Sequence, residues 1–396
     1  MDGDRRGWRA CLLSGAVFAV CMAGTTLPTP LYPLYQEEFG FSELTVTVVY
    51  AVYAFGVIGV LLLTGNVSDA VGRRKVLAWG LGCAALSAGC FLCATGLGWL
   101  YAGRLLSGLS AGLFTGAATA YVMELAPPGG TARATFVATA ANMGGLGCGP
   151  LLAGLLAQYA PWPLYLPFAV HLALVAGAAL VLLRLPETVG ERRPLSAVRP
   201  RRPGLPAQVR TVFGPAAIAS FVGFALFGVF TSVSPAFLAQ SLDVDDHAVS
   251  GLVVALAFFA STAGQLAVGR VGVGKSLPLG CAALLAGLAL LAGALHWDLL
   301  ALVVLSALVG GGGQGLAFRG AMAAVAAASP ADQRAAVIST LFVVAYAGIS
   351  VPVIGVGLLT GPIGLESAGL VFIACMTVLV VTAGGYLLRR PVPADT

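Results

Sequence analysis

Two arginines stand out among the residues that could do chemistry, because each lies well inside a long apolar stretch. Most charged side chains of the chain stand between such stretches, whereas Arg104 and Arg319 lie within them. A charge is costly in an apolar medium, so a buried arginine usually faces a polar interior, where it binds an anion or takes part in proton movement. Both residues are therefore candidates for a functional site, although Arg104 could instead extend its guanidinium towards water at the end of its stretch.

The other chemistry-bearing residues do not assemble into an enzyme. The three histidines, His171, His247 and His296, fall in separate apolar stretches. Among the eight cysteines, Cys90 and Cys93 lie one turn apart, a spacing that could hold a metal, but no histidine lies at ligand spacing and we expect both to be small core residues. No phosphate-binding loop of the ATPase type is present either. An imidazole titrates near neutral pH, so the centrally placed His171 is a candidate proton site, with a neutral hydrogen-bonded packing residue as the alternative. We expect no enzyme activity, no metal, no organic cofactor and no nucleic-acid partner.

The composition indicates a protein of the lipid bilayer. Of the 396 residues, 59% are hydrophobic and 9% are charged, whereas soluble domains carry about 25% charged residues. A bilayer core requires about 20 apolar residues per helix, and unbroken runs such as 163–183 favour helices over a closed barrel. We therefore predict an all-α membrane protein with twelve transmembrane helices. The expected spans are 10–35, 44–66, 74–95, 97–124, 133–158, 162–185, 211–239, 247–270, 276–296, 298–328, 334–359 and 363–388.

The basic residues predict the orientation of these spans. Outside the spans, every Lys and Arg falls on one side, in the terminal segments, the central loop and the loops that follow spans 2, 4, 8 and 10. The positive-inside rule places that side, and both termini, in the cytoplasm. Arginine far outnumbers lysine in this Ala- and Gly-rich chain, which suggests a bacterial genome and hence the bacterial inner membrane. The first apolar run is too long for a cleavable signal peptide.

The two halves of the chain repeat each other weakly. A shift of about 202 residues pairs Pro150 with Pro352 and Pro128 with Pro330. Parallel six-helix repeats place a transporter's substrate site near the membrane midplane, between the halves. We predict two pseudo-symmetric six-helix bundles, over residues 1–185 and 211–396. The basic linker between them, residues 186–210, is expected to be flexible beside anionic headgroups, with a regulator-docking site as the alternative.

A charged turn joins the second and third spans. It reads Gly65-Asn-Val-Ser-Asp69-Ala-Val-Gly72-Arg73-Arg74; its glycines permit close packing and a tight turn, and its aspartate can accept charge-assisted hydrogen bonds from the arginines. The turn resembles the G-x-x-x-D-x-x-G-[RK]-[RK] signature of the major facilitator superfamily. A basic turn that only anchors topology is the alternative.

The resemblance implies a role for this turn. In the family, the turn closes the cytoplasmic side as a conformational latch when the cavity faces outward. The implied latch residues are Gly65, Asp69, Gly72, Arg73, Arg74 and, as partner of the first arginine, Glu124. The corresponding turn between spans 8 and 9 contains no acid, so we expect the latch to be one-sided.

Two further spans carry glycine patterns that resemble those of the same family. Arg104 in span 4 begins an R-x-x-x-G-x-x-x-G pattern, which the family associates with proton coupling. Span 5 resembles the G-x-x-x-G-P-x-x-G-G motif of the family's exporters, except for Ala153 at the first glycine of the last pair. Its matching residues are Gly145, Gly149, Pro150 and Gly154. Such glycines let helices approach closely, and a proline kinks its helix.

Polar residues and prolines interrupt spans 1 and 7. Three prolines between Pro28 and Pro33 cannot continue a regular helix, and Pro235 interrupts span 7. Interrupted helices at corresponding places of two halves indicate the binding site; a structural kink at the outer mouth is the alternative. The substrate-binding candidates are Thr25, Thr26, Thr29, Tyr32, Asn142, Ser232, Ser234, Gln314 and Arg319.

These observations predict a secondary active exporter. The chain most resembles the twelve-span drug:proton antiporters, which implies export of a small amphipathic drug, antibiotic or metabolite by alternating access, driven by a proton gradient. No carboxylate lies centrally in a span, so we expect a neutral or anionic cargo anchored by Arg319. A monomer in the bilayer is expected. An importer or facilitator of a sugar or other metabolite is the alternative, and the span-5 pattern weighs against it.

Overall fold

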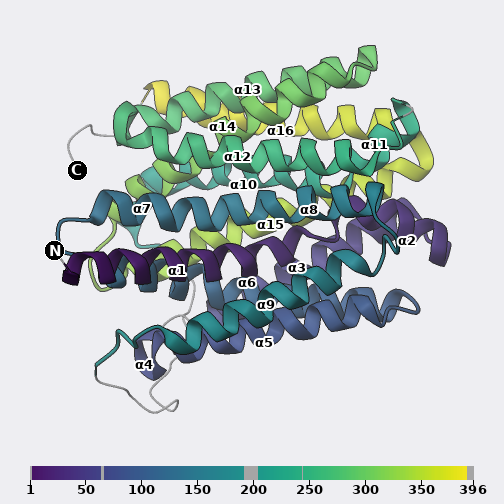
Figure 1. The fold of residues 1–396 in the computed structure, drawn as a ribbon. Helices are drawn as coiled ribbons and strands as arrows, with labels where there is room; N and C mark the ends of the chain where they lie inside the picture. Colours follow the sequence, from purple (N-terminus) through teal and green to yellow (C-terminus); the bar gives the residue numbers. More distant parts are fainter. Residues whose placement is uncertain (1, 64–66, 191–203, 243, 390–396) are drawn as a thin grey trace. The chain divides into compact units, whose positions relative to one another are not determined.

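The computed structural model describes residues 2–63, 67–190, 204–242 and 244–389, and all the regular elements in these residues are helical (Figure 1). Twelve stretches of these residues are long and apolar enough to cross a membrane, which confirms the predicted fold class. The elements are α1 (Asp2–Thr26), η1 (Thr29–Leu31), α2 (Tyr32–Phe39), α3 (Glu43–Leu63), α4 (Val67–Val71), α5 (Arg73–Leu92), α6 (Leu97–Leu125), α7 (Thr131–Thr139), η2 (Ala140–Gly144), α8 (Gly145–Tyr159), α9 (Leu166–Arg184), η4 (Ala207–Val209), α10 (Arg210–Ser232), α11 (Ser234–Ser241), α12 (His247–Val271), α13 (Val273–Trp297), α14 (Leu300–Ala328), α15 (Arg334–Ile363) and α16 (Leu365–Arg389).

Contacts divide the chain into two compact units. The first unit comprises Met1–Leu31 and Val52–Arg201, and the second comprises Tyr32–Ala51 and Arg202–Thr396. This division differs from the predicted halves over residues 32–51, which group with the second unit. The physical reason is packing, because α2 contacts α11 and a side chain at Gly357 of α15 would overlap Thr47.

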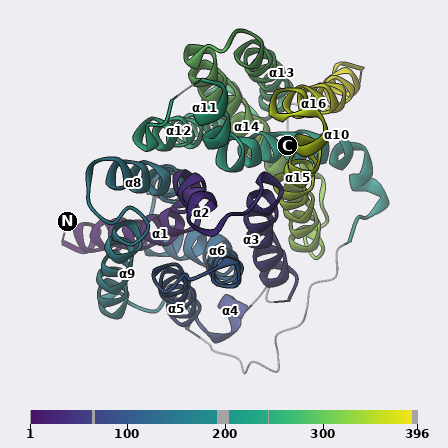
Figure 2. The ribbon, with the colours of Figure 1, turned by 90° about the vertical axis from the view of Figure 1, so that its right-hand side faces the viewer.

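In the first unit, α1 packs against α6, α8 and α9, and α5 packs against α6 and α9 (Figure 2). Glycines permit close contact between α6 and α3. A Cβ atom at Gly108 would overlap the carbonyl oxygen of Tyr53, and one at Gly112 would lie 2.7 Å from the Cβ atom of Val60. The predicted stripe of small residues therefore brings two backbones together, as it does in other membrane bundles.

In the second unit, α14 packs against α10, α12 and α13, and α10 also packs against α15 (Figure 2). Glycines again permit a close helix contact, because Cβ atoms at Gly311 and Gly315 of α14 would overlap the carbonyl oxygens of Ala257 and Ser261 of α12. Each unit also has a glycine with positive φ directly before a long helix. Gly72 before α5 has φ 107° and ψ 144°, and Gly272 before α13 has φ 84° and ψ 148°. These local correspondences agree with the internal repeat.

The structure confirms both predicted helix interruptions and adds a third. The first span breaks after Thr26, and the seventh breaks at Val233 between α10 and α11. Span 5 contains a π-helical turn at Ala140–Gly144, which the sequence did not predict. Two predicted helix ends were wrong. The helix α1 begins at Asp2 rather than near residue 10 and so includes the charged N-terminal residues, and α15 continues to Ile363 rather than ending at residue 359.

Candidate functional site

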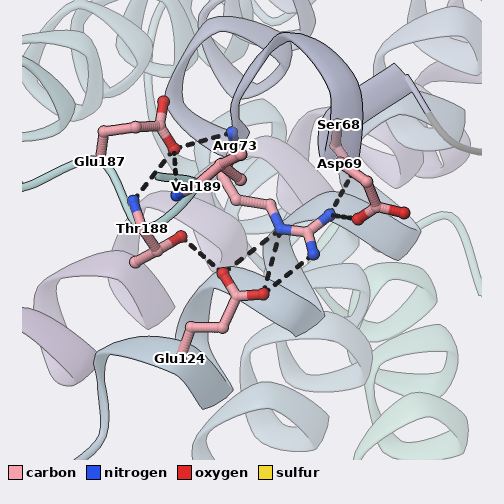
Figure 3. Close-up of polar contacts among 7 residues, drawn as sticks. All are labelled: Ser68, Asp69, Arg73, Glu124, Glu187, Thr188 and Val189. Carbon is pink, nitrogen blue, oxygen red and sulfur yellow. Dashed lines mark hydrogen bonds and ion pairs between the residues drawn. The ribbon is translucent and has the colours of Figure 1, made fainter. Parts of the chain in front are cut away.

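Arg73 is the centre of the charged turn in the first unit (Figure 3). Its Nη1 atom forms an ion pair with Asp69 and donates to Ser68 Oγ at 2.6 Å, while its Nη2 atom donates to Glu124 Oε1 at 2.9 Å. One guanidinium thus joins two carboxylates from α4 and α6, a strong charge-assisted arrangement. The Arg73 side chain is 12% exposed, whereas the side chains of Asp69 and Glu124 are 58% and 37% exposed, so solvent screens both ion pairs in part.

Glu187, in the segment after α9, caps the N-terminus of α5. Its Oε1 atom accepts from the backbone N–H of Arg73 at 2.9 Å, and its Oε2 atom accepts from that of Arg74 at 3.3 Å. The first turn of a helix has backbone donors without intrahelical partners, and a carboxylate there also complements the helix dipole. This role could not be predicted from the sequence, because the two segments lie 114 residues apart and no spacing pattern joins them.

The conformation of Gly72 explains why a glycine stands there. Its φ of 107° disfavours any other residue, and a Cβ atom would lie 2.5 Å from Glu187 Oε2. Thr188 completes the cluster by donating to Glu124 Oε2 at 2.5 Å. The cluster therefore ties the ends of α4, α5, α6 and α9 together within one unit.

The remaining predicted latch residues are not part of the described ion-pair cluster around Arg73. The Arg74 side chain contacts the end of α9, where its Nη2 atom donates to the carbonyl oxygen of Leu183 at 2.9 Å. Gly65 lies outside the described residues. In the second unit, Arg270 and Lys275 have no ion pair among the residues that the structure describes, which agrees with the absence of an acid from that turn.

Arg104 is buried inside the first unit, where it caps the broken end of α1. It is 1% exposed, and its Nη1 atom donates to the carbonyl oxygen of Thr25 at 2.6 Å. The carbonyls of the last helical turn lack intrahelical donors, and a cation complements the C-terminal end of the helix dipole. The Arg104 guanidinium also lies 4.7 Å from the ring centroid of Tyr53. The side chain does not extend to the surface, which was the alternative considered from the sequence.

His171 contacts the same helix one turn earlier. It is 2% exposed, and its Nε2 atom lies 3.1 Å from the carbonyl oxygen of Val20. A carbonyl only accepts, so the neutral ring holds its proton on Nε2 and leaves Nδ1 as an acceptor. A Cβ atom at Gly24 would overlap this ring, which identifies Gly24 as a residue that the sequence analysis missed. The geometry suits the packing alternative and keeps one nitrogen available for a proton.

A small cavity adjoins His171 between α1, α5, α6 and α9. Its volume is about 10 Å³, and Thr25 and Ser107 are among its lining residues. The Ser107 hydroxyl is buried without a hydrogen-bond partner among the described residues. The cavity therefore has about the volume that one water molecule needs, beside the His171 side chain.

The span-5 glycines form the contact between α8 and α1. A Cβ atom at Gly145 would lie 2.7 Å from the carbonyl oxygen of Ala19, and one at Gly149 would overlap that of Ala23. Thr26 Oγ1 donates across this contact to the carbonyl oxygen of Leu146 at 2.6 Å. Pro150 and Gly154 are buried on the same helix. The exporter-type motif therefore packs against the end of α1 that Arg104 caps.

The substrate-binding candidates of the first unit are mostly engaged by backbone. Thr25 Oγ1 donates to the carbonyl oxygen of Met22 at 2.7 Å, and Thr26 bonds to α8 as described above. Thr29 is 2% exposed. Asn142 is half-buried and lies in the π-helical turn, a distortion that is frequent at functional sites. Asn142 is therefore the candidate of this unit whose polar group is most readily offered to a ligand.

The candidates of the second unit differ in their surroundings. Gln314 is 1% exposed; its Oε1 atom accepts from Ser261 Oγ at 2.6 Å, whereas its Nε2 atom has no partner among the described residues. Ser232 donates to the carbonyl oxygen of Gly228 at 2.7 Å. The remaining candidates are Tyr32 and Ser234, which are buried, and Arg319, which is half-buried.

Arg319 is the charged candidate of the second unit. It lies on α14, after Gln314 on the same helix. Within the part of the chain that the structure describes, no carboxylate forms an ion pair with it. The described residues also contain no group of three or more His, Cys, Asp or Glu side chains that could hold a metal ion.

Comparisons with known proteins identify relatives. The family model described as Major Facilitator Superfamily matches residues 13–351. A puromycin resistance protein, pur8, from Streptomyces alboniger is 34% identical over 206 residues, which are 50% of this chain and 39% of that protein. An uncharacterized MFS-type transporter, YceJ, from Bacillus subtilis (strain 168) is 28% identical over 72% of this chain and 71% of that protein. The match thus spans only about two fifths of the first relative's length.

A solved structure shares the fold. The crystal structure of a POT family transporter in complex with a thioalcohol-conjugated peptide superposes with a TM-score of 0.78, covering 97% of this chain and 96% of that one. The sequence identity is 13%, so this likeness concerns the fold alone.

Proposed function

We propose that this chain, which belongs to the Major Facilitator Superfamily, exports a small amphipathic molecule by alternating access in exchange for protons. Membership of the family makes it a multi-pass membrane transporter. The export direction, the coupling ion and the cargo are the parts that we propose.

The observation that carries the export proposal is the contact between α8 and α1. Gly145 and Gly149 bring the exporter-type motif directly onto the α1 backbone, and Thr26 bonds the two helices at the point where α1 ends. A motif typical of the family's exporters thus packs against α1, the helix that Arg104 and His171 also contact. The name of the Streptomyces relative, a puromycin resistance protein, also supports efflux.

The proton-coupling proposal rests on a short segment of α1. The segment from Val20 to Thr25 accepts hydrogen bonds from His171 at one end and from Arg104 at the other. A proton on the Nδ1 atom of His171 would charge the ring that lies against this turn. Because both side chains bond to the same backbone segment, a change of charge at one is transmitted to the other through α1 and across to α8.

The cargo proposal rests on the charges of the spans. Arg319 lies within α14, and the described spans carry no carboxylate paired with it. A partly buried guanidinium is stabilised by an anion, by carbonyl groups or by water. We therefore propose a neutral or anionic amphipathic cargo that binds at Arg319, with Gln314 of the same helix assisting.

An efflux assay in cells tests the export direction. Cells that express the wild-type chain are loaded with puromycin, or with neutral and anionic amphipathic compounds, and the retained amount is followed after removal of the external compound. We expect faster loss from wild-type cells than from cells with an equally well-inserted Gly149→Leu variant. Faster accumulation in wild-type cells would instead support the importer alternative.

A further inference from the structure

A groove between α5 and α9 of the first unit lies outside the sites described above. Figure 1 shows these two helices running alongside each other. The groove has a volume of about 610 Å³, within the range of about 300–1,000 Å³ that is typical of ligand sites. It does not belong to the α1 cluster around Arg104 and His171, and none of the proposed cargo contacts lines it.

Small side chains on both helices create this groove. Ala78, Gly82 and Ala85 line it from α5, and Ala176 and Ala179 line it from α9. A Cβ atom at Gly82 would meet no other atom within 4 Å, so the space beside this residue is open. Exposed leucines stand on the same two helices, with Leu86 at 62%, Leu180 at 60% and Leu183 at 69% exposure. The groove is therefore an apolar channel on a surface suited to lipid tails.

The length of the groove fits one leaflet of a bilayer. Its lining along α5 extends from Arg74 to Ala85, which is about 16 Å at about 1.5 Å per residue. One leaflet contributes about half of the roughly 30 Å hydrocarbon core. A single acyl chain laid along α5 would therefore reach from the headgroup level to about the midplane.

One end of the groove is basic. Arg74 and Lys75 both line it; Lys75 is exposed, and the Nε atom of Arg74 is buried without a hydrogen-bond partner among the described residues. Glu187 lies at the same end, but its two oxygens accept the backbone N–H groups of the first turn of α5. Two cations therefore face one carboxylate that the helix end already binds, and an added anion is favoured there.

We propose that this groove binds an anionic phospholipid, with one acyl chain between α5 and α9 and the phosphate at Arg74 and Lys75. Basic pockets between helices on the positively charged side of a membrane protein recognise anionic headgroups in this way. The apolar channel alone would accept any acyl chain, so the two cations supply the preference for a net negative headgroup. The inference does not depend on the direction of transport or on the cargo.

The test is native mass spectrometry of the purified full-length protein with phosphatidylglycerol or phosphatidylcholine of identical acyl chains. We expect the wild type to retain more phosphatidylglycerol than phosphatidylcholine at equal concentration. Lys75→Gln should reduce retention of phosphatidylglycerol about fivefold, the contribution expected of one basic residue near an anionic surface. Gly82→Leu should reduce retention of both lipids, because its side chain fills the open space of the groove.

Two matched variants control for general effects of the substitutions. Lys275→Gln removes the exposed lysine at the corresponding place in the first turn of α13. Gly89→Leu adds the same bulk to α5 at another glycine with no neighbour within 4 Å. Neither residue lines the groove, so both variants should retain lipids as the wild type does. Monodisperse elution in detergent establishes that each variant is folded.

Three results would overturn the proposal. Equal retention of the two lipids by the wild type would show that Arg74 and Lys75 do not select an anionic headgroup. Unchanged retention by Gly82→Leu would place the bound lipid elsewhere. Displacement of phosphatidylglycerol by a transported compound, together with loss of that compound's transport in Gly82→Leu, would assign the groove to cargo instead.

Discussion

The guanidinium of Arg104 caps the C-terminal end of α1 by donating to the carbonyl oxygen of Thr25 at 2.6 Å. This contact joins two features that the sequence presents separately, a buried charge in the fourth span and a proline-rich break in the first. The break releases carbonyl groups from the helix ladder, and the buried arginine binds one of them. The buried charge of the first unit therefore binds the end of a helix.

The first prediction concerns this cap. Arg104→Gln should lower the stability of the detergent-solubilised protein by about 1–3 kcal/mol, because a buried carbonyl loses a charged donor. Thermal unfolding in detergent measures the change. Arg184→Gln, which alters an exposed arginine at the end of α9, is the control and should leave the unfolding temperature nearly unchanged. Equal stability of the two variants would show that Arg104 does not cap α1.

The second prediction concerns the cap that Glu187 provides for α5. Glu187→Ala should destabilise the protein by about 1 kcal/mol, the usual effect of losing an N-terminal cap. Thermal unfolding again provides the measurement. Glu366→Ala is the matched control, since Glu366 is an exposed acid in the first turn of α16 without a hydrogen bond to backbone among the described contacts. A larger loss in the control would contradict the role of Glu187.

The third prediction concerns the ion pairs of Arg73. Asp69→Asn or Arg73→Ala should leave the protein folded but slow its turnover, because each change removes the guanidinium–carboxylate contacts that join α4, α5 and α6. Initial transport rates in vesicles are the measurement. Arg270→Ala, at the corresponding turn without an acid, should have a much smaller effect. Wild-type transport rates in both Asp69→Asn and Arg73→Ala would show that this turn does not act as a conformational latch.

The fourth prediction concerns the contact between α8 and α1. Gly149→Leu should abolish transport, because a side chain at this position would overlap the carbonyl oxygen of Ala23 and force the two backbones apart. Gly177→Leu on α9, where a Cβ atom meets nothing within 4 Å, should transport normally. Transport of a labelled compound by membrane-inserted protein compares the two variants. Normal transport by Gly149→Leu would contradict the importance of the contact.

The sequence predicted what depends on composition and on nearby residues. Apolar runs predicted the twelve spans, and the prolines after Thr26 predicted the first helix break, because both effects act within a few residues. Gly24 and Glu187 could not be assigned from the sequence, since their roles depend on His171 and on the first turn of α5, which only the folded chain brings to them. The π-helical turn at Ala140–Gly144 was missed as well, because no residue type in it demands that conformation.

Transport driven by an imposed pH gradient tests the central claim most directly. Purified protein in liposomes with an acidic lumen should accumulate a cargo compound against its concentration gradient, and a protonophore should abolish that accumulation. A panel that begins with puromycin and includes neutral, anionic and permanently cationic amphipathic compounds covers the proposed cargo classes. Proton-coupled export predicts uphill uptake only when the lumen is the more acidic side. Uphill uptake only with an alkaline lumen, or uptake that the gradient does not affect, would contradict proton-coupled export.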